Sequence, residues 1–168
     1  NRDRMEHHPR RRGGCLIMAK SKSCCCCGSK KKCSGAHVYA IELKPEVIAE
    51  KKFRIDAGIN EDYTGRCFYV GQTRQHSVEC RFNQHRAKKR IREKPSATFE
   101  CTCKTGLTQE VKYNGYNRGN RYVRKYAKRL AYELFVHLNP LPKKCDPREA
   151  EAALAQSLRS QGFAVHYK

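Results

Sequence analysis

Two tyrosines stand in short apolar segments of the kind that form strands. Tyr39 lies in residues 37–43 (HVYAIEL) and Tyr69 in residues 67–72 (CFYVGQ). If these segments pair as neighbouring strands, the two phenols can pack against each other across the pair. A tyrosine beside a cation or a metal-bound water can also act as a general base, although its reference pKa is about 10. The pattern leaves both interpretations open, aromatic packing and proton transfer.

An arginine and a histidine stand four residues apart in the next segment. Ser77 is followed by a narrow apolar stripe and a Lys/Arg-rich stretch that Pro95 ends, which predicts a basic helix with Ser77 as its N-cap. In a helix Arg81 and His85 point to the same side. A guanidinium and an imidazole on one side could bind a phosphate together. The alternative is a solvated basic face.

A carboxylate stands on the apolar side of the last predicted helix, residues 147–161. Asp146 fits as its N-cap, Pro147 as its first residue, and Gly162 marks its C-terminal end. Glu151 is followed by apolar residues at i+3, i+4 and i+7, which places its carboxylate on the side that faces the core. A carboxylate is costly to bury alone. Glu151 therefore needs either a Lys or Arg partner or a hard cation such as Mg²⁺.

Taken in order, these segments resemble a GIY-YIG nuclease domain over about residues 36–165. The resemblance is carried by HVY at 37–39, YVGQT at 69–73, RFNQH at 81–85 and ExxLAxxLRxxG at 151–162. His37 stands where the first glycine of the family would be. The two tyrosines are also further apart in the sequence than in compact members of the family.

The resemblance implies a role for each site residue. It implies that Tyr39 is the general base that activates water and that Tyr69 assists or positions it. It implies that Arg81 stabilises the phosphate with support from His85. It also implies that Glu151 binds one divalent cation, Mg²⁺ or another. Metal and arginine would neutralise the charge that develops on the phosphoryl oxygens, while the base deprotonates the nucleophile.

The predicted elements indicate an α+β domain with a small central antiparallel sheet flanked by helices. The further elements are strands around 99–103, at 134–138 and at 163–167, and a helix at 121–130. Residues 44–66 form either a long excursion or a short helix plus a loop. Residues 1–35 are expected to be a basic, Cys-rich tail, disordered or ordered by a partner. The GIY-YIG-like domain is expected to cover residues 36–168.

The charge of the chain indicates its class of partner. There are 36 Lys and Arg against 16 Asp and Glu in 168 residues, a formal net charge of +20. Such a charge favours a polyanion, with DNA expected first, RNA or a ribonucleoprotein particle second, and a membrane surface last. No apolar run approaches the roughly 18 residues of a membrane-spanning helix. We see no secretory signal, so we expect an intracellular, reducing compartment, the cytoplasm or the nucleus.

Two basic stretches, residues 86–94 and residues 112–132, are candidates for nucleic-acid binding. The second of them carries interleaved tyrosines, a composition suited to phosphate contacts and base stacking. The candidate residues are Lys88, Lys89, Arg90, Arg118, Arg121, Arg124, Lys125, Lys128 and Arg129. The alternative is a solvated helix whose tyrosines pack inward.

The chain has 11 cysteines, an odd number that argues against a disulfide framework and for free thiols. Cys24 and Cys27 have CxxC spacing and Cys33 could be a third ligand, so a Zn²⁺ site is one interpretation. Acylation beside the polybasic segment and a flexible thiol-rich tail are the alternatives. Cys67 and Cys80 are expected to be small core residues.

Three functions remain open from the sequence. The first is a metal-dependent endonuclease that hydrolyses phosphodiester bonds in DNA. The second is a catalytically inactive protein of the same fold that binds structured RNA or a ribonucleoprotein particle such as the ribosome. The third is a membrane-surface protein tethered through its Cys-rich tail.

Overall fold

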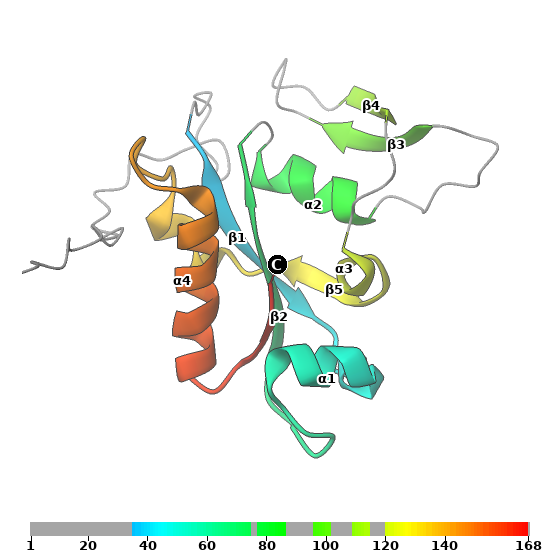
Figure 1. Cartoon of the computed structure of the whole chain (residues 1–168). Helices are drawn as coiled ribbons and strands as arrows, with labels where there is room; N and C mark the ends of the chain where they lie inside the picture. Colours follow the sequence, from blue (N-terminus) through cyan, green and yellow to red (C-terminus); the bar gives the residue numbers. More distant parts are fainter. Residues whose placement is uncertain (1–34, 75–76, 87–95, 102–108, 115–119, 168) are drawn as a thin grey trace, which may run out of the picture.

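The computed structural model of the chain describes residues 35–74, 77–86, 96–101, 109–114 and 120–167. Within them the fold is α+β, as predicted, with a four-stranded sheet flanked by helices (Figure 1). Several predicted features lie outside the described residues: the tail, the trio Cys24, Cys27 and Cys33, and the basic residues Lys88, Lys89, Arg90 and Arg118.

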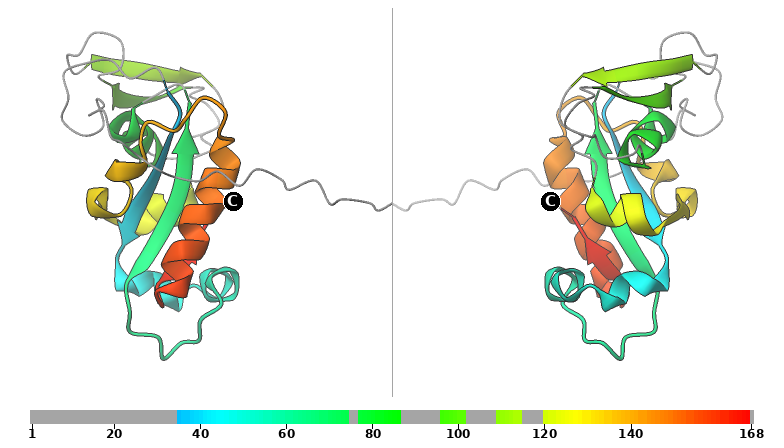
Figure 2. Two further views of the ribbon diagram at one scale, coloured as in Figure 1. Left: turned by 90° about the vertical axis from the view of Figure 1, so that its left-hand side faces the viewer. Right: turned by 90° about the vertical axis from the view of Figure 1, so that its right-hand side faces the viewer.

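The main sheet is mixed, whereas an antiparallel sheet was predicted. The strand order is β5-β1-β2-β6, with β1 at His37–Leu43, β2 at Cys67–Thr73, β5 at Ala127–Leu130 and β6 at Ala164–His166. β1 is antiparallel to β2 and β5, but β6 runs parallel to β2. The parallel pair arises because the last helix returns the chain to the end of the sheet at which β2 begins. Figure 2 shows β1 and β2 between this helix and residues 132–138.

One face of the sheet carries both tyrosines of the predicted site. Tyr39 lies opposite Gly71 and Tyr69 lies opposite Ile41 in the β1–β2 register. Side chains alternate between the faces along a strand, and residues opposite each other share a face, so all four lie on the same face. Every residue of β1 is buried, which places this strand at the centre of the core.

The segment between β1 and β2 is a short helix plus a loop, the second of the two alternatives. It contains the 3₁₀ helix η2, Pro45–Ala49, and the helix α1, Lys51–Ala57. Gly58 ends α1 in the left-handed conformation, with φ of 68°. Glycine adopts this conformation without the steric cost that other residues meet.

The helix that carries the predicted phosphate-binding pair is α2, Val78–Arg86. Ser77 caps it as predicted, because its Oγ accepts the backbone N–H of Cys80 at 3.2 Å. The strands β3, Ser96–Cys101, and β4, Gln109–Asn114, form a separate antiparallel pair beside α2 (Figure 1). β3 lies where a strand was predicted. β4 was not predicted, because its charged and amide residues weaken the strand signal.

The helix predicted over residues 121–130 is too long. α3 covers Arg121–Tyr126 and the chain then enters β5, which pairs with β1. The apolar spacing fits both outcomes, and the open edge of β1 favours the strand. Asn120, the residue before α3, caps it by accepting the backbone N–H groups of the second and third helical residues, Tyr122 and Val123, at 2.8 and 3.3 Å.

The strand predicted at residues 134–138 is wrong. Two 3₁₀ turns take its place, η3 at Tyr132–Leu134 and η4 at Val136–Leu138. The following residue, Asn139, explains the difference. Its side chain accepts the N–H of Val38 at 2.9 Å and donates to the carbonyl of Val38 at 2.8 Å. One side chain thus satisfies the β1 backbone that another strand would have paired.

The last helix, α4, covers Pro147–Ser160 and confirms the prediction from its caps. The Asp146 side chain accepts the N–H of Arg148 at 3.0 Å, and Gly162 follows the helix with φ of 86°. Glu151 is buried on the same side of α4 as Leu154 and its apolar neighbours, as predicted. Among the described helices, none is long and apolar enough to cross a membrane.

Candidate active site

Tyr39 and Tyr69 lie against each other on the face of the sheet that α2 and α4 approach. Their ring centroids are 6.3 Å apart, and the residues are 1% and 4% exposed. The aromatic packing expected from the two strand segments is therefore present. It leaves both hydroxyl groups inside the molecule, where their hydrogen-bond partners decide what they can do.

His85 of α2 contacts Tyr39 and is held by the chain on its other side. Its Nε2 lies 2.7 Å from the Tyr39 hydroxyl oxygen, and its Nδ1 accepts the backbone N–H of Asn120 at 2.9 Å. A backbone N–H can only donate, so Nδ1 carries no proton in this arrangement. Neutral His85 therefore has its proton on Nε2 and donates it to Tyr39. A donor at this oxygen stabilises the phenolate form of Tyr39.

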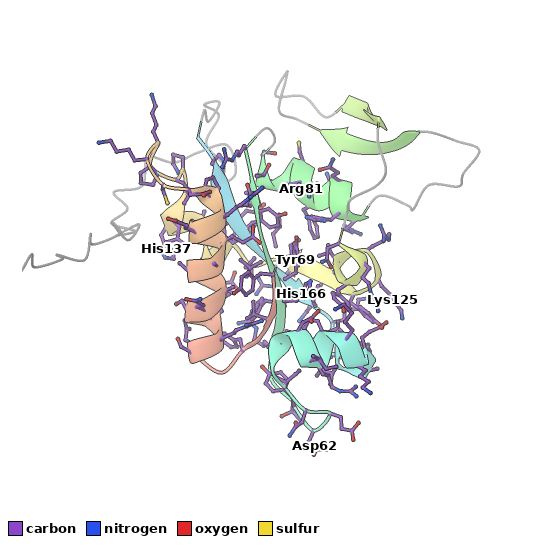
Figure 3. The ribbon with its side chains drawn as sticks, viewed as in Figure 1. Asp62, Tyr69, Arg81, Lys125, His137 and His166 are labelled. Carbon is purple, nitrogen blue, oxygen red and sulfur yellow. The ribbon has the colours of Figure 1, made fainter. Side chains whose placement is uncertain are left out.

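Arg81 approaches the same hydroxyl group from the previous turn of α2. Its Nη1 donates to the side-chain carbonyl of Gln84, a buried residue one turn later. A hydrogen bond and the positive charge of Arg81 both lower the pKa of Tyr39. Figure 3 shows Arg81 and Tyr69 in the region between α2 and α4. The i, i+4 pair Arg81 and His85 thus faces the tyrosines as one unit.

Glu151 brings a carboxylate to the tyrosines from α4. It is 6% exposed, and its negative charge raises the pKa of both Tyr39 and Tyr69. The structure therefore brings together all five residues that the sequence placed in one site, Tyr39, Tyr69, Arg81, His85 and Glu151.

Burial sets the protonation of the two phenols. Desolvation, with smaller contributions from Tyr69 and Glu151, raises the pKa of Tyr39 well above its ordinary value, although Arg81 opposes the rise. Desolvation is also the main reason that the pKa of Tyr69 is raised to about 12. Both tyrosines consequently keep their protons at neutral pH. Further positive charge at the site would be needed to release one of them.

The donor set suits a hard cation bound by a single carboxylate. In the described parts of the chain, no three His, Cys, Asp or Glu residues cluster as a metal-binding group. Mg²⁺ commonly binds through one or two carboxylates, with water and substrate phosphate completing its shell. The buried carboxylate of Glu151 beside two hydroxyl groups fits that pattern. It does not fit a zinc site built from thiolates and imidazoles.

Two residues of the site had no role assigned from the sequence. Asn120 fixes His85 through its backbone and caps α3 through its side chain. Gln84 orients Arg81. The local sequence carries a signal for the first, because asparagine before a helical segment is a favoured N-cap. No local signal marks Gln84, since its partner is recognisable only once the helix is built.

The predicted nucleic-acid surface of α3 and β5 is largely compensated within the protein. Arg121 and Lys125 pair with Glu50 at 2.8 and 3.0 Å. Hydrogen bonds from Lys125 and then Tyr126 are the largest causes that lower the pKa of Glu50 to about 2. These two cations are thus already engaged with a carboxylate.

The cations of β5 are engaged in the same way. Lys128 and Arg129 lie 3.1 and 2.9 Å from the buried carboxylate of Glu42, and Arg129 also pairs with Glu133 at 2.6 Å. Arg124 differs from them. It is half-buried, and its Nη1 has no hydrogen-bond partner in the described structure.

The cysteines give a mixed outcome. Cys67 and Cys80 are both buried, which confirms them as core residues. Cys145 is disulfide-bonded, which differs from the expectation of free thiols.

Comparisons with protein-family models, curated proteins and solved structures give no match.

Proposed function

We propose that this chain is a metal-dependent endonuclease that hydrolyses phosphodiester bonds in DNA. The observation that carries the proposal is the meeting of two tyrosines, an arginine, a histidine and a carboxylate from β1, β2, α2 and α4. The resemblance of the four sequence segments to a GIY-YIG nuclease domain supports the same function. A DNA substrate makes the cytoplasm or the nucleus the expected place of action.

The contacts of each site residue support a separate role for it in the hydrolysis. Arg81, oriented by Gln84, supplies a guanidinium for a phosphoryl oxygen. Tyr39 would first lose its own phenol proton to solvent, and the phenolate, stabilised by the Nε2–H of His85, would then accept the proton of the attacking water. Tyr69 packs on Tyr39 and His85 and restricts the orientation of both rings. A rigidly held base and guanidinium need little reorganisation during reaction.

Glu151 would hold the divalent cation. When bound, that cation would offset the negative charge of Glu151 beside the tyrosines and stabilise charge on the phosphate. The residue's burial on the first turns of α4 keeps its carboxylate in one place. The contribution of Glu151 is therefore to fix where positive charge enters the site.

A second candidate function uses the same fold without catalysis. The protein would bind structured RNA or a ribonucleoprotein particle such as the ribosome. The raised pKa values of both tyrosines favour it, since a protonated phenol is not a base. The net charge of +20 suits either function.

Cleavage of supercoiled plasmid and of a branched DNA tests the proposal, with Mg²⁺ or EDTA, using the full chain. We expect cutting that needs Mg²⁺ and that falls at least about 100-fold in Glu151→Gln, as for loss of a charge-stabilising group. Glu149→Gln is the matched control, because Glu149 is exposed on the same helix. It should cut like the wild type. Binding without cutting at any Mg²⁺ or Mn²⁺ concentration would refute the nuclease and favour the second function.

A further inference from the structure

The cations of the described structure fall into two groups, according to whether an acidic side chain neutralises them. On α3 and β5, carboxylates pair with Arg121, Lys125, Lys128 and Arg129. In the loop before α4 and on its first turn, three exposed cations have no ion pair with an acid among the described residues. They are Lys143, Lys144 and Arg148, which we call the α4 basic patch.

The α4 basic patch lies next to the proposed site. Arg148 is the second residue of α4, and Glu151 follows it by less than one helical turn. Arg74, just beyond the end of β2, pairs with Asp146 at 3.5 Å and so links that strand to the loop. In Figure 1 this end of α4 lies by the start of β1 and the end of β2. Figure 3 places Lys125, a compensated cation, well away from it.

The N-terminal segment joins the fold at the same place. Leu141 donates its backbone N–H to Ala36 at 2.8 Å, and a Cβ on Gly35 would come within 2.8 Å of Pro140. Residues 1–34 contain ten Lys and Arg against two acids. The sequence therefore attaches a basic stretch close to the α4 basic patch.

We infer that the α4 basic patch, and not the α3–β5 surface, is where the phosphate backbone of duplex DNA docks beside the site. The physical reason is competition. A cation that already pairs with a carboxylate must break that ion pair to contact a phosphate. An uncompensated cation breaks no ion pair, so the full free energy of the phosphate contact and of counterion release favours binding. The inference rests on the proposed function for its choice of DNA as the partner. It does not depend on cleavage.

Two triple variants with the same change of charge test the inference. One is Lys143→Gln/Lys144→Gln/Arg148→Gln. The control is Arg121→Gln/Lys125→Gln/Lys128→Gln, which removes three exposed but paired cations. Binding of a labelled DNA duplex by the full chain is followed by fluorescence anisotropy in EDTA, over a series of salt concentrations. Thermal denaturation by circular dichroism checks that both variants fold.

The plot of the logarithm of the binding constant against the logarithm of the salt concentration has a negative slope. We expect the patch variant to reduce the magnitude of this slope by about 0.9 for each phosphate that the protein no longer neutralises, so by about 2 to 3 in total. The control variant should lower it by less than about 1. Equal reductions in the two variants would overturn the inference, because net charge alone would then explain binding. So would a wild-type chain that does not bind the duplex, or one that binds an RNA duplex more tightly.

The two proposals fail in different experiments. A chain that binds DNA through the patch and never cuts it refutes the nuclease alone. A chain that cuts DNA and loses equal affinity in both triple variants refutes the docking surface alone.

Discussion

Gly71 leaves the space that the ring of Tyr39 occupies. The two residues lie opposite each other in the β1–β2 pair, and a Cβ built on Gly71 would lie 2.6 Å from the Tyr39 hydroxyl oxygen. The backbone of Gly71 is not in the left-handed region, which in the described chain only Gly58 and Gly162 occupy. Glycine is therefore needed at this position for space and not for its backbone freedom.

Gly71→Ala should displace the Tyr39 ring and break its contact with His85. We expect cleavage to fall at least about tenfold and the free energy of unfolding to fall by about 1 to 3 kcal/mol, as for an overpacked core. Urea unfolding followed by circular dichroism measures the second value. In a Tyr39→Ala background, Gly71→Ala should leave the free energy of unfolding almost unchanged, because the ring that it would displace is absent. An equal cost in both backgrounds would show that the clash is not the cause.

The parts of this site that were predictable from sequence are those set by local rules. The four-residue spacing of Arg81 and His85 and the caps around α4 fix which side chains share a helix face. The strand at Ala127–Leu130 was missed because its pairing with β1 depends on residues far away in the sequence. The contact of Asn120 with His85 was missed for the same reason. The fold class could be predicted from the pattern of elements alone, whereas the contact partners of each side chain could be identified only in the structure.

The protonation of His85 is a separate prediction. We expect ¹⁵N NMR of the full chain at neutral pH to show Nδ1 without a proton and the proton on Nε2. Scalar coupling from the Asn120 amide nitrogen to His85 Nδ1 would demonstrate the hydrogen bond directly. A protonated Nδ1 in neutral His85 would contradict the arrangement, and Tyr39 would then have to donate to Nε2 instead.

The burial of Tyr69 should appear as a loss of stability at alkaline pH. Its pKa is about 12 in the folded chain against an ordinary value of 10. Between these values the unfolded chain loses the proton that the folded chain keeps, so stability is full below pH 10 and falls as pH rises toward 12. Between pH 10 and pH 12, the free energy of unfolding of Tyr69→Phe should fall by about 3 kcal/mol less than that of the wild type, since each pKa unit corresponds to about 1.4 kcal/mol. The control is Tyr167→Phe, a change at a half-buried tyrosine on the C-terminal side of β6. Its free energy of unfolding should fall as steeply as that of the wild type.

His37 should make the fold sensitive to acid. It is 2% exposed, neither ring nitrogen has a hydrogen-bond partner in the described structure, and burial lowers its pKa below 6.5. Below pH 6.5 the His37 ring binds a proton in the unfolded chain but not in the folded chain. Stability is therefore retained above pH 6.5 and is lost as pH falls.

His37→Leu removes both the unpaired nitrogens and the proton uptake. We expect it to stabilise the chain by about 1 to 3 kcal/mol at neutral pH, the usual cost of a buried polar group without a partner. The difference from the wild type should widen as pH falls below 6.5. Because the chain has no tryptophan, unfolding in urea is best followed by circular dichroism. His137→Leu, at an exposed position, should change neither the stability nor its pH dependence appreciably. If His37→Leu destabilises the chain at every pH, the His37 ring must have a polar partner that stabilises it, and the acid sensitivity must come from other groups.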